Sequence, residues 1–414
     1  MLKSEANTLT FDVTVADNVA KKVIFGILKQ LDGVGITIAE YNGETTQFGD
    51  HEAACQAHII VNNLGFYQRV LRGGSIAAAE AYIDGWWDSP DLTQVIRVIA
   101  RNLPVLDNIE AKVGWITQLS EKWLHRSRRN NKTAAKKNIL AHYDLGNDFY
   151  RTFLDSNMLY SAGIYDSQAT TLEQAQINKM DRLCQQLDLQ PTDHLLEIGT
   201  GWGAMAIHAA KHYGCRVTTT TISNAQHAWA KEKIEAAGLS NHITLLLEDY
   251  RDLTGEYDKI VSIEMIEAVG KEYLTTYLHK CQSLLKPDGL IAIQAITIAD
   301  QRYDSYSKGV DFIQKYIFPG GFLPSITVLS SQLTAHTDFV IRDIKDIGMD
   351  YAKTLSDWHQ RFEAQIDQMA AFGLDERFIR MWRFYFCYCE GGFRERSIST
   401  VQLLASRQGW REDG

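Results

Sequence analysis

The sequence predicts an α/β protein in which a mostly parallel, doubly wound sheet with a helical insertion follows a small α+β domain. Three observations support this fold class. From about residue 171 onward, apolar strand-like runs alternate with helical stretches, a rhythm that requires parallel strands joined by helical crossovers. The apolar run that begins at residue 195 enters a glycine-rich turn and leaves it as a helix. Residues 1 to about 110 instead mix short strand-like and helical runs, as expected of a separate α+β unit.

The first part of the chain, residues 1–110, is expected to form this α+β domain. Its strand-like runs are TLTFDVTV, GVGITIAEY and HIIVNN, and its helical runs are NVAKKVIFGILKQL and AAAEAYIDGWW. Residues 111–138 are expected to form a helical linker that becomes strongly basic, with seven Lys or Arg and no acid between residues 122 and 137. This basic stretch is either a solvated face or a surface for anionic lipid headgroups, where each basic residue contributes about 1 kcal/mol.

The third segment, residues 139–414, contains the predicted sheet. A helix is expected over TLEQAQINKMDRLCQQL because its apolar residues recur at helical spacing. HLLEIG and the β-branched CRVTTTTIS are expected strands, and the helices GAMAIHAAKHY and NAQHAWAKEKIEAAG follow them. Three more strands are expected at ITLLLEDY, YDKIVSIEM and DGLIAIQAIT. An aromatic-rich insertion at 300–325, two helices at 351–371 and 375–391, and a last strand, SISTVQLLAS, complete the segment.

Composition excludes several classes of protein. The chain has 414 residues, 45% hydrophobic and 22% charged, which is typical of globular proteins. Its formal net charge of -9 gives no general argument for nucleic-acid binding. The N-terminus lacks the apolar core of a secretory signal, and no run approaches the roughly 20 apolar residues that cross a bilayer. Six cysteines without a CxxC pair favour free thiols in a reducing cytoplasm over disulfides or a zinc site.

The glycine turn indicates the ligand of the sheet, because ligands of such sheets bind beyond the carboxyl ends of the strands. Gly199, Gly201 and Ala204 satisfy G-x-G-x-x-[G/A], a weak signal alone. A dinucleotide site also needs an acid about 20 residues further on, and VTTTTIS has none. An acid instead precedes the turn, Glu197, which is unfavourable for a pyrophosphate and favourable for an ammonium group.

S-adenosylmethionine fits these features better than a nicotinamide dinucleotide does. It carries an ammonium group and no phosphate, and its sulfonium suits acidic and aromatic surroundings. After the third strand, Glu248, Asp249 and Tyr250 follow ITLLL, and a carboxylate there can accept from an adenine amino group. The sheet is therefore predicted to be a Rossmann-like class I methyltransferase sheet.

At these residues the chain resembles the cyclopropane-fatty-acyl-phospholipid synthase family of S-adenosylmethionine-dependent methyltransferases, from about 139 to 406. The strings that carry the resemblance are HYDLGNDFY, MLYSAGIY, LEIGTGWG, TISNAQ, EDYRDL, SIEMIEAVG, KYIFPGG, DYAKTL and WRFYFCYCEGGFRER. The N-terminal domain resembles the family's first domain through AEAYIDGWWDSPDL at 79–92.

The resemblance implies which residues hold the cofactor, S-adenosylmethionine. They are Tyr160 and Ser161 at its methionine end, Gly199, Gly201 and Gly203 along its backbone beside Glu197, Thr221 and Gln226 at the ribose, and Asp249 and Tyr250 at the adenine.

The resemblance also implies a second small ligand, a bicarbonate ion that serves as a base. Glu267 and Tyr351 match the residues that hold it, and the backbone of Ile296 contributes. The chain departs from the family pattern at three positions at or near this site, which are Ala162 in place of a cysteine and Ala268 and Gln294 in place of histidines. Gln294 can still hydrogen-bond to an anion through its amide, but it cannot be protonated.

The expected reaction adds one carbon from the sulfonium to the double bond of an unsaturated phospholipid acyl chain. The resulting carbocation is stabilised by aromatic faces, about 0.5 to 2 kcal/mol each, and Tyr316 of the insertion is the first choice for this role. Glu267 is the expected base, acting directly or through an anion or water. Loss of a proton from the new methyl group closes a cyclopropane, the favoured product, whereas loss from the chain carbon gives a methyl-branched olefin, which a partner reductase would convert to a methyl-branched chain.

Other functions stay open at this point. One is methylation of a small soluble acceptor, and another is a non-catalytic lipid-binding role. A nicotinamide oxidoreductase lacks its ribose acid. The sequence favours a cytoplasmic protein that associates with the anionic inner face of the membrane through the basic segment, the N-terminal domain and exposed aromatics such as Trp86 and Trp87. For the two tryptophans, inter-domain packing is the favoured alternative to membrane docking. The resemblance implies a homodimer.

Overall fold

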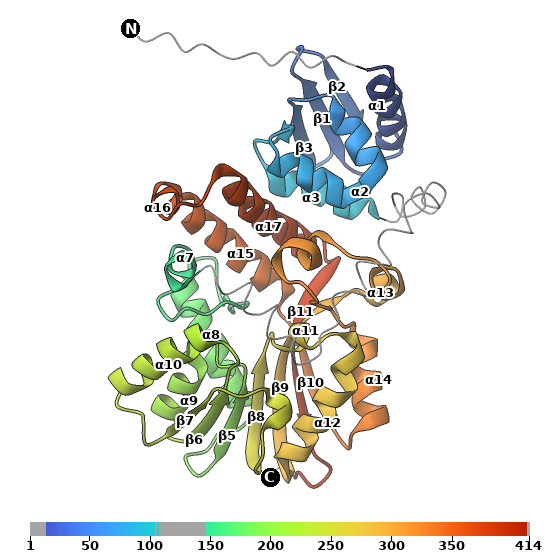
Figure 1. Cartoon of the computed structure of the whole chain (residues 1–414). Coiled ribbons are helices and arrows are strands. Elements are labelled where there is room, and N and C mark those ends of the chain that lie inside the picture. The colour runs from blue at the N-terminus through green and yellow to red at the C-terminus, as the bar shows by residue number, and fades with distance from the viewer. Residues whose placement is uncertain (1–13, 104–105, 107–145, 412–414) are drawn as a thin grey trace. The chain divides into compact units, whose positions relative to one another are not determined.

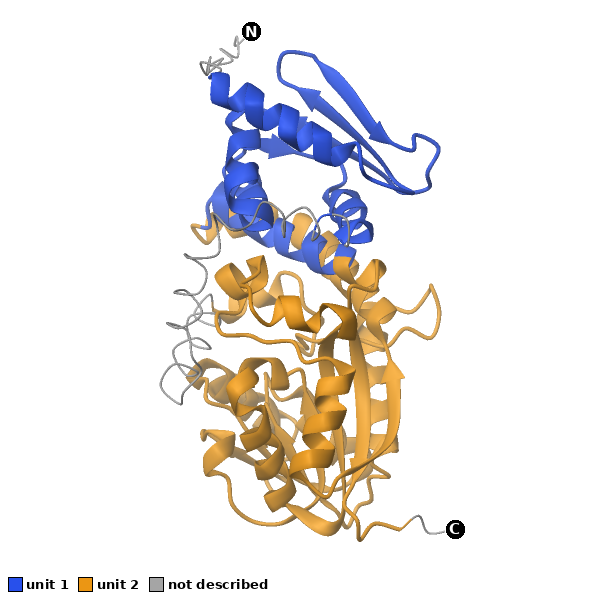
Figure 2. Ribbon diagram, turned by 90° about the vertical axis from the view of Figure 1, so that its right-hand side faces the viewer, with its two compact units in different colours: residues 1–120, 374–391 blue, residues 121–373, 392–414 orange. Residues whose placement is uncertain are grey.

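The computed structural model of the chain describes residues 14–103, 106 and 146–411 (Figure 1). The expected linker at 111–138, with its basic stretch at 122–137, lies outside the described residues. The chain divides into two compact units, residues 1–120 with 374–391 and residues 121–373 with 392–414 (Figure 2). The expected division placed 374–391 with the sheet domain, whereas the structure groups this stretch with the N-terminal unit.

Helix α17, Glu376–Arg394, gives the physical reason for this grouping. Arg380 on this helix donates from Nε to the carbonyl of Tyr82 over 2.6 Å and from Nη2 to the carbonyl of Trp87 over 3.0 Å. Its guanidinium also lies 4.1 Å from the centre of the Tyr82 ring. Aromatic side chains of the same helix are buried, among them Trp382, Tyr385 and Phe386.

The N-terminal unit contains a four-stranded sheet with strand order β2-β1-β3-β4. The strands are β1 (Gly35–Glu40), β2 (Thr45–Gly49), β3 (Gln56–Val61) and β4 (Trp87–Asp88), and the helices besides α17 are α1 (Val15–Leu28), α2 (Gly65–Ile83) and α3 (Leu92–Arg101). β2 is not expected from the sequence, since its TTQFG is mostly polar and buries only Phe48. α1 begins at Val15, behind a capping box of Thr14 and Asp17, three residues before the predicted helix start at Asn18. Residues 8–13 of the predicted strand TLTFDVTV lie outside the described residues.

Trp87 belongs to the core of the N-terminal unit, which excludes it as an exposed residue for membrane docking. The side chain is 3% exposed, and its Nε1 donates to the carbonyl of Ala78 over 2.8 Å. Its ring contacts those of Phe66 and Tyr82. Trp86 is partly exposed, and the guanidinium of Arg69 lies 4.8 Å from its ring centre.

The second unit contains a seven-stranded sheet with strand order β10-β11-β9-β8-β5-β6-β7. Its strands are β5 (His194–Ile198), β6 (Arg216–Thr220), β7 (Ile243–Leu246), β8 (Tyr257–Ile263), β9 (Leu285–Ile298), β10 (Val340–Asp346) and β11 (Ile398–Ser406). Five adjacent strands are parallel to one another: β9, β8, β5, β6 and β7. β11 lies antiparallel to both β9 and β10. The prediction of a mostly parallel α/β sheet is confirmed.

Helices cover both faces of this sheet because its strands are apolar on both sides (Figure 1). Leu195 packs with helices α8 (Leu172–Gln186), α9 (Ala204–Tyr213) and α10 (Asn224–Ala236) on one face. Leu196, the next residue, packs with α12 (Leu274–Leu284) and α14 (Ile326–His336) on the other face. The alternation along β5 thus divides the core into two layers.

The chain reverses direction across the sheet between β5 and β8, because β6 and β7 extend to one side of β5 and β9 to the other. At such a switch point the loops beyond the carboxyl ends of neighbouring strands separate and leave room for a ligand. The glycine turn follows β5, and the short helix α11, Ile266–Val269, follows β8 at the same edge.

The predicted insertion follows β9 and comprises helix α13 (Asp300–Tyr306) and one π-helical turn (Ile313–Ile317). The predicted helix at 351–371 consists of two helices, α15 (Gly348–Glu363) and α16 (Ile366–Ala371). In the described part of the chain, no helix is both long and apolar enough to span a bilayer.

Candidate active site

The glycine turn after β5 has the backbone that close approach of a ligand requires. Gly199, Gly201 and Gly203 all have positive φ angles, of 104°, 53° and 96°. A Cβ atom on Gly203 would lie 3.1 Å from the Cβ of Ala230, so this glycine allows close packing of the turn against α10. A Cβ atom on Gly201 would meet nothing within 4 Å, which leaves its backbone open to a ligand.

Glu197, at the end of β5, is a buried carboxylate, 2% exposed. Its Oε2 accepts a hydrogen bond of 2.6 Å from the hydroxyl of Thr219, and that hydroxyl lies 2.6 Å from the hydroxyl of Thr200. Burial raises the pKa of Glu197 to about 8. Among the described residues, no cation forms an ion pair with this carboxylate, so the ammonium group of a ligand would compensate it. The turn and Glu197 together fit the amino-acid end of S-adenosylmethionine.

Thr221 and Gln226 come together beyond β6, as the resemblance implies. Both are buried, and the hydroxyl of Thr221 donates to Oε1 of Gln226 over 2.8 Å. Ser223 caps α10 by accepting from the backbone N–H of Gln226, which fixes this side chain at the first turn of the helix. Because its Oε1 accepts from Thr221, Nε2 of Gln226 is the atom of this side chain that can donate to a ligand hydroxyl.

Asp249 and Tyr250 lie beyond the end of β7, at the expected adenine end of the site. Asp249 is engaged by Arg251, which donates from Nε to Oδ1 over 2.8 Å and from Nη2 to Oδ2 over 2.6 Å. This pairing holds the strand end in place and compensates the charge of Asp249. The ring of Tyr250 packs at 5.4 Å against that of Tyr277.

The segment 158–165 carries Tyr160 and Ser161. The Tyr160 ring lies within 6.1 Å, centre to centre, of four other aromatic rings, those of Tyr150, Phe153, Trp358 and Phe318. Ser161 is buried, and its hydroxyl accepts from Nζ of Lys179 over 2.6 Å. These five rings form an apolar, aromatic wall, and their contacts fix the position of Tyr160 in it.

Lys179 is a site residue that the sequence reasoning missed. It is fully buried on α8, and burial lowers its pKa to about 8 despite the nearby charges of Glu264 and Asp155. Gln176 of the same helix donates to the carbonyl of Ser161 over 2.9 Å. A signal was available, because Leu172, Gln176, Lys179 and Leu183 recur at spacings of 4, 3 and 4 along one buried helix face.

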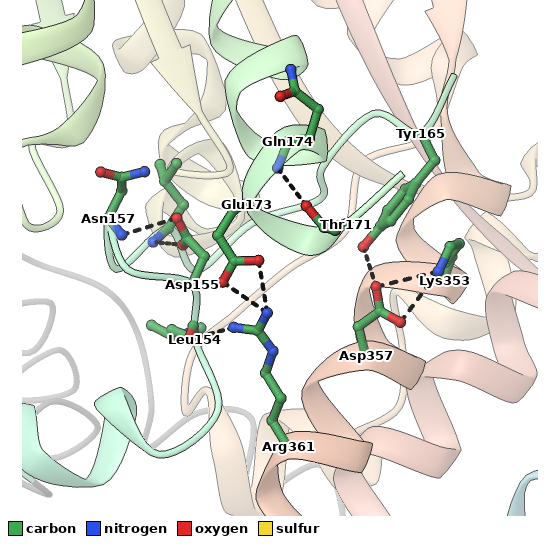
Figure 3. A network of polar contacts seen from close by, with 11 residues as sticks. Leu154, Asp155, Asn157, Tyr165, Thr171, Glu173, Gln174, Lys353, Asp357 and Arg361 are labelled. Atoms are coloured by element: carbon green, nitrogen blue, oxygen red, sulfur yellow. Dashed lines mark hydrogen bonds and ion pairs between the residues drawn. The ribbon is translucent and has the colours of Figure 1, made fainter. Parts of the chain in front are cut away.

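Helix α15 holds the segment 158–165 through one face (Figure 3). Its side chains Asp350, Thr354 and Asp357 accept, in that order, from the backbone N–H of Tyr165, the backbone N–H of Gly163 and the phenol of Tyr165. The distances are 3.1, 3.1 and 2.8 Å. Since these residues recur every three or four positions, the helix presents them together.

The same face of α15 continues to Arg361, which joins two more segments (Figure 3). Its Nη2 lies 2.8 and 2.9 Å from the two carboxylate oxygens of Glu173, and its Nη1 donates to the carbonyl of Leu154 over 3.1 Å. Asp155, next in the chain, accepts from the backbone N–H groups of Asn157 and Leu159. The turn before Tyr160 is therefore held both by Arg361 and by the hydrogen bonds to Asp155.

Glu264, directly after β8, is the most heavily hydrogen-bonded carboxylate of the site. Its Oε1 accepts from the backbone N–H of Ala162 over 2.9 Å and from Nε2 of Gln294 over 2.8 Å. Its Oε2 accepts from the phenol of Tyr351 over 2.9 Å. Burial raises the pKa of Glu264, and the hydrogen bonds and the charge of Lys179 oppose this effect. The sequence reasoning assigned no role to Glu264.

Glu267 lies one helical turn away, on α11. Its Oε1 accepts from the backbone N–H of Ile296 over 2.5 Å, as the resemblance implies, while Oε2 is buried without a partner in the described part of the chain. Burial, and secondly the charge of Glu264, raise the pKa of Glu267 to about 8. Tyr351, expected beside Glu267, donates instead to Glu264.

Gln294 positions its neighbours. It lies fully buried on β9, donates from Nε2 to Glu264 and to the carbonyl of Ala162, and accepts at Oε1 from Nε2 of Gln402 over 3.0 Å. Both the nitrogen and the oxygen of the Gln294 amide therefore form hydrogen bonds. Because the nitrogen donates and the oxygen accepts, these partners fix the orientation of the amide.

The insertion covers Glu267. The backbone N–H of Phe322 donates to the carbonyl of Glu267 over 2.9 Å. Phe318 is the residue of the insertion whose ring contacts Tyr160, at 6.1 Å, whereas the ring of Tyr316 lies 5.4 Å from Phe312. The aromatic wall beside Tyr160 thus includes Phe318, two residues beyond the expected Tyr316.

The two halves of the site adjoin each other at Met265. A Cβ atom placed on Gly199 would lie 3.3 Å from Cγ of Met265, the residue between Glu264 and the start of α11. The predicted cofactor residues and the two carboxylates consequently share one edge of the sheet. Such an arrangement can hold a cationic donor beside a water-poor, aromatic compartment that contains a proton acceptor.

Comparison with known proteins shows the family of the chain and two similar proteins. Residues 130–403 match the family described as mycolic acid cyclopropane synthetase. The tuberculostearic acid methyltransferase UfaA1 of Mycobacterium tuberculosis is 37% identical over 83% of this chain and 81% of its own length. The cyclopropane-fatty-acyl-phospholipid synthase of Escherichia coli is 37% identical over 85% of this chain and 88% of its own length.

Solved structures of two cyclopropane synthases are also similar to the chain. The cyclopropane synthase MmaA2 from Mycobacterium tuberculosis matches with a TM-score of 0.61 at 29% identity and covers 66% of this chain and 98% of its own. The mycolic acid cyclopropane synthase CmaA1, complexed with SAH and CTAB, matches with a TM-score of 0.62 at 30% identity and the same coverage of both chains.

Proposed function

Because the chain belongs to the mycolic acid cyclopropane synthetase family and is an S-adenosylmethionine-dependent methyltransferase, we propose that it transfers a one-carbon unit to the double bond of an unsaturated phospholipid acyl chain, with a cyclopropane as the product. The observation that carries this proposal is the pair of carboxylates, Glu264 and Glu267, beside both the glycine turn and the aromatic wall around Tyr160.

The chemistry of the cofactor explains why such a site is needed. When bound, S-adenosylmethionine supplies an electrophilic methyl group on a sulfonium. An alkene is a weak nucleophile, so the chain must exclude water and stabilise a cation on the acyl carbon. Tyr316 of the insertion, and Tyr160, whose ring packs on Phe153 and Trp358, are the proposed aromatic faces, and each contributes about 0.5 to 2 kcal/mol where it is desolvated and faces the cation.

Ring closure needs a base beside the new methyl group. When a C–H bond of that methyl group breaks, its electron pair forms the third C–C bond of the ring, and the proton passes to an acceptor of the protein. A carboxylate of the site can take this proton without large movement. A buried carboxylate also stabilises the preceding cation through its charge, which is more effective in a water-poor site than in solution.

A second product follows from the same intermediate. If the proton leaves an acyl carbon instead, a methyl-branched olefin results, and a partner reductase would complete a methyl-branched chain. The relative named as a tuberculostearic acid methyltransferase favours this candidate, because it is as similar to this chain as the Escherichia coli synthase is. Ala162, Ala268 and Gln294, which lack thiol and imidazole groups, are the positions at which to look for the difference.

The place of action would be an anionic membrane surface on the cytoplasmic side, reached by a homodimer. The support is the basic stretch at 122–137, read from sequence alone. Replacing Arg128, Arg129, Lys136 and Lys137 by Gln is expected to weaken binding to vesicles of dioleoyl phosphatidylglycerol at low salt. Unchanged binding would remove the docking role, and sedimentation equilibrium would test the dimer.

Mass spectrometry of lipids from cells that express the protein with methyl-labelled methionine tests the proposed reaction. A cyclopropane and a methyl-branched olefin add the same mass, so derivatisation of the remaining double bonds must follow. A labelled product of this mass without a double bond supports ring formation. A labelled olefin, or a saturated labelled product heavier by two hydrogens, supports the second candidate. Label in a small soluble acceptor, or no transfer to lipid, would contradict the proposal.

A further inference from the structure

The carboxylate of Glu264 lies in an anion site whose hydrogen-bond donors come from three different segments of the chain. The donors are the backbone N–H of Ala162, the amide of Gln294 on β9 and the phenol of Tyr351 on α15. Three convergent donors around one buried carboxylate are the usual composition of an anion-binding cage. In this chain the anion is part of the polypeptide.

The backbone at Glu264 supports a specific role. Its φ angle is 49°, in the left-handed region that residues other than glycine rarely adopt. Such a conformation costs about 1 kcal/mol or more and persists where surrounding contacts enforce it, commonly at functional sites. Here the contacts are the three donors and the backbone N–H of Glu264, which donates to the carbonyl of Gln294 over 2.8 Å.

The two carboxylates of the site are held differently. Glu264 has three donors and the favourable charge of Lys179, whereas Glu267 has one donor and an unpartnered oxygen. Two close carboxylates resist being charged together, so the better-stabilised one ionises first. Glu264 is thus the carboxylate of the pair that ionises first, and Glu267 is the one that retains a proton. This assignment reverses the expectation that Glu267 is the base.

We infer that the Glu264 carboxylate is the resident anion and proton acceptor of the active site, in place of the free bicarbonate ion that the family resemblance implies. This inference rests on the proposed one-carbon transfer to an alkene. Oε1 of Glu264 is occupied by two donors, whereas among the described residues Oε2 accepts from the phenol of Tyr351 alone, so Oε2 takes the proton. The step converts the carboxylate to a neutral carboxylic acid, while the electron pair of the broken C–H bond enters the new C–C bond.

The decisive variant is Glu264→Gly, because glycine tolerates the left-handed backbone and leaves a space of carboxylate size between the three donors. Without added anion, kcat is expected to fall at least 100-fold, the usual contribution of a general base. Bicarbonate or formate should restore kcat at least 10-fold. Glu264→Gln is the matched control, since it removes the charge and keeps the space filled. It should lose activity without rescue.

The wild-type enzyme provides the opposing measurement. Its kcat with vesicles of dioleoyl phosphatidylethanolamine and phosphatidylglycerol should change less than twofold when bicarbonate is removed by degassing. A tenfold loss that added bicarbonate reverses would overturn the inference. Calorimetry with S-adenosylmethionine confirms that each variant keeps the cofactor site and is folded.

A binding experiment separates this inference from the proposed function. If the wild-type protein transfers no label to any unsaturated lipid, the proposed function fails, yet ¹³C-bicarbonate binding still reports on the cage. The inference requires bound bicarbonate in Glu264→Gly and none between the same donors in the wild type, as crystals grown in bicarbonate would show. Bicarbonate on Ala162 N and Tyr351 of the wild type, or no anion in the glycine variant, overturns it.

Discussion

The phenol of Tyr351 donates a hydrogen bond of 2.9 Å to Oε2 of Glu264 and thereby links helix α15 to the loop after β8. The Tyr351 ring is stacked on that of Phe393, with centres 4.6 Å apart, so its position is fixed by packing as well as by the hydrogen bond. The Tyr351 ring also lies 6.0 Å from that of Trp358, so Tyr351 connects the aromatic wall to the charged centre of the site.

Replacing Tyr351 by Phe is expected to lower kcat about 10- to 100-fold, since a hydrogen bond to a charged group contributes about 1.5 to 3 kcal/mol. The phenol opposes the burial that raises the pKa of Glu264, so its loss raises this pKa further. A base must be ionised to act, and the rising limb of the kcat–pH profile should move to higher pH. Affinity for S-adenosylmethionine should stay within twofold.

The matched control is Tyr165→Phe, which removes the phenol that donates to Asp357 over 2.8 Å, another tyrosine–carboxylate pair on α15. It should leave the pH profile of kcat unchanged. Equal shifts in both variants would show that the effect comes from loosening α15 and not from Glu264.

Replacing Gly201 by Ala is expected to weaken S-adenosylmethionine binding at least tenfold, because the added methyl group would occupy open space over the turn. Gly238→Ala is the control. Gly238 has a φ angle of 70° and, like Gly201, open space around its missing Cβ. Both variants should lose about 1 to 2 kcal/mol of unfolding free energy from backbone strain. Calorimetry that finds equal cofactor affinity in the two variants would contradict the binding role of the turn.

Replacing Glu197 by Gln is expected to change the pH dependence of stability. The folded pKa of about 8 lies above the ordinary 4.5, so between these values the folded state holds a proton that the unfolded state has lost. The contribution of Glu197 is therefore present below pH 4.5 and is lost as the pH rises to 8. The stability of the Gln variant relative to wild type should increase across this window by on the order of a few kcal/mol in urea unfolding. Glu232→Gln, exposed on α10, should show no such trend.

Replacing Arg361 by Gln is expected to lower the unfolding free energy by about 1 to 2 kcal/mol. The half-exposed ion pair with Glu173 contributes at most about 1 kcal/mol, and the hydrogen bond to the carbonyl of Leu154 about as much. Arg151→Gln, which removes an exposed pair with Asp148 at 3.8 Å, should change stability by less than about 0.5 kcal/mol. Comparable losses in the two variants would argue against a bracing role for Arg361.

The sheet could be predicted from sequence because its signals are local. Apolar runs of strand length, helices of amphipathic period and the glycine turn at 199–203 each report their own element. Gly199, Thr221 and Asp249 could be predicted as cofactor residues for the same reason, since they follow closely on strand ends. β2 was not predicted because only Phe48 of its five residues is buried. Pairing with β1, and not its own sequence pattern, makes this segment a strand.

The charged centre could not be predicted as fully, because it is assembled from distant segments. Ala162 and Glu264 are 102 residues apart, and Glu264 and Tyr351 are 87 apart. Glu264 and Glu267 both follow the same predicted strand, and nothing local distinguishes them. Only the positions of the three donors show which carboxylate is caged.

The path of the chain has a consequence for biosynthesis. Arg380 binds the carbonyl of Tyr82, 298 residues earlier, so the first unit lacks part of its core until α17 has been made. At about 5 to 20 residues per second, this interval lasts about 15 to 60 s. During this time the N-terminal unit is therefore expected to lack the packing of Phe384 of α17 on the Tyr82 ring, so apolar surface stays uncovered during translation.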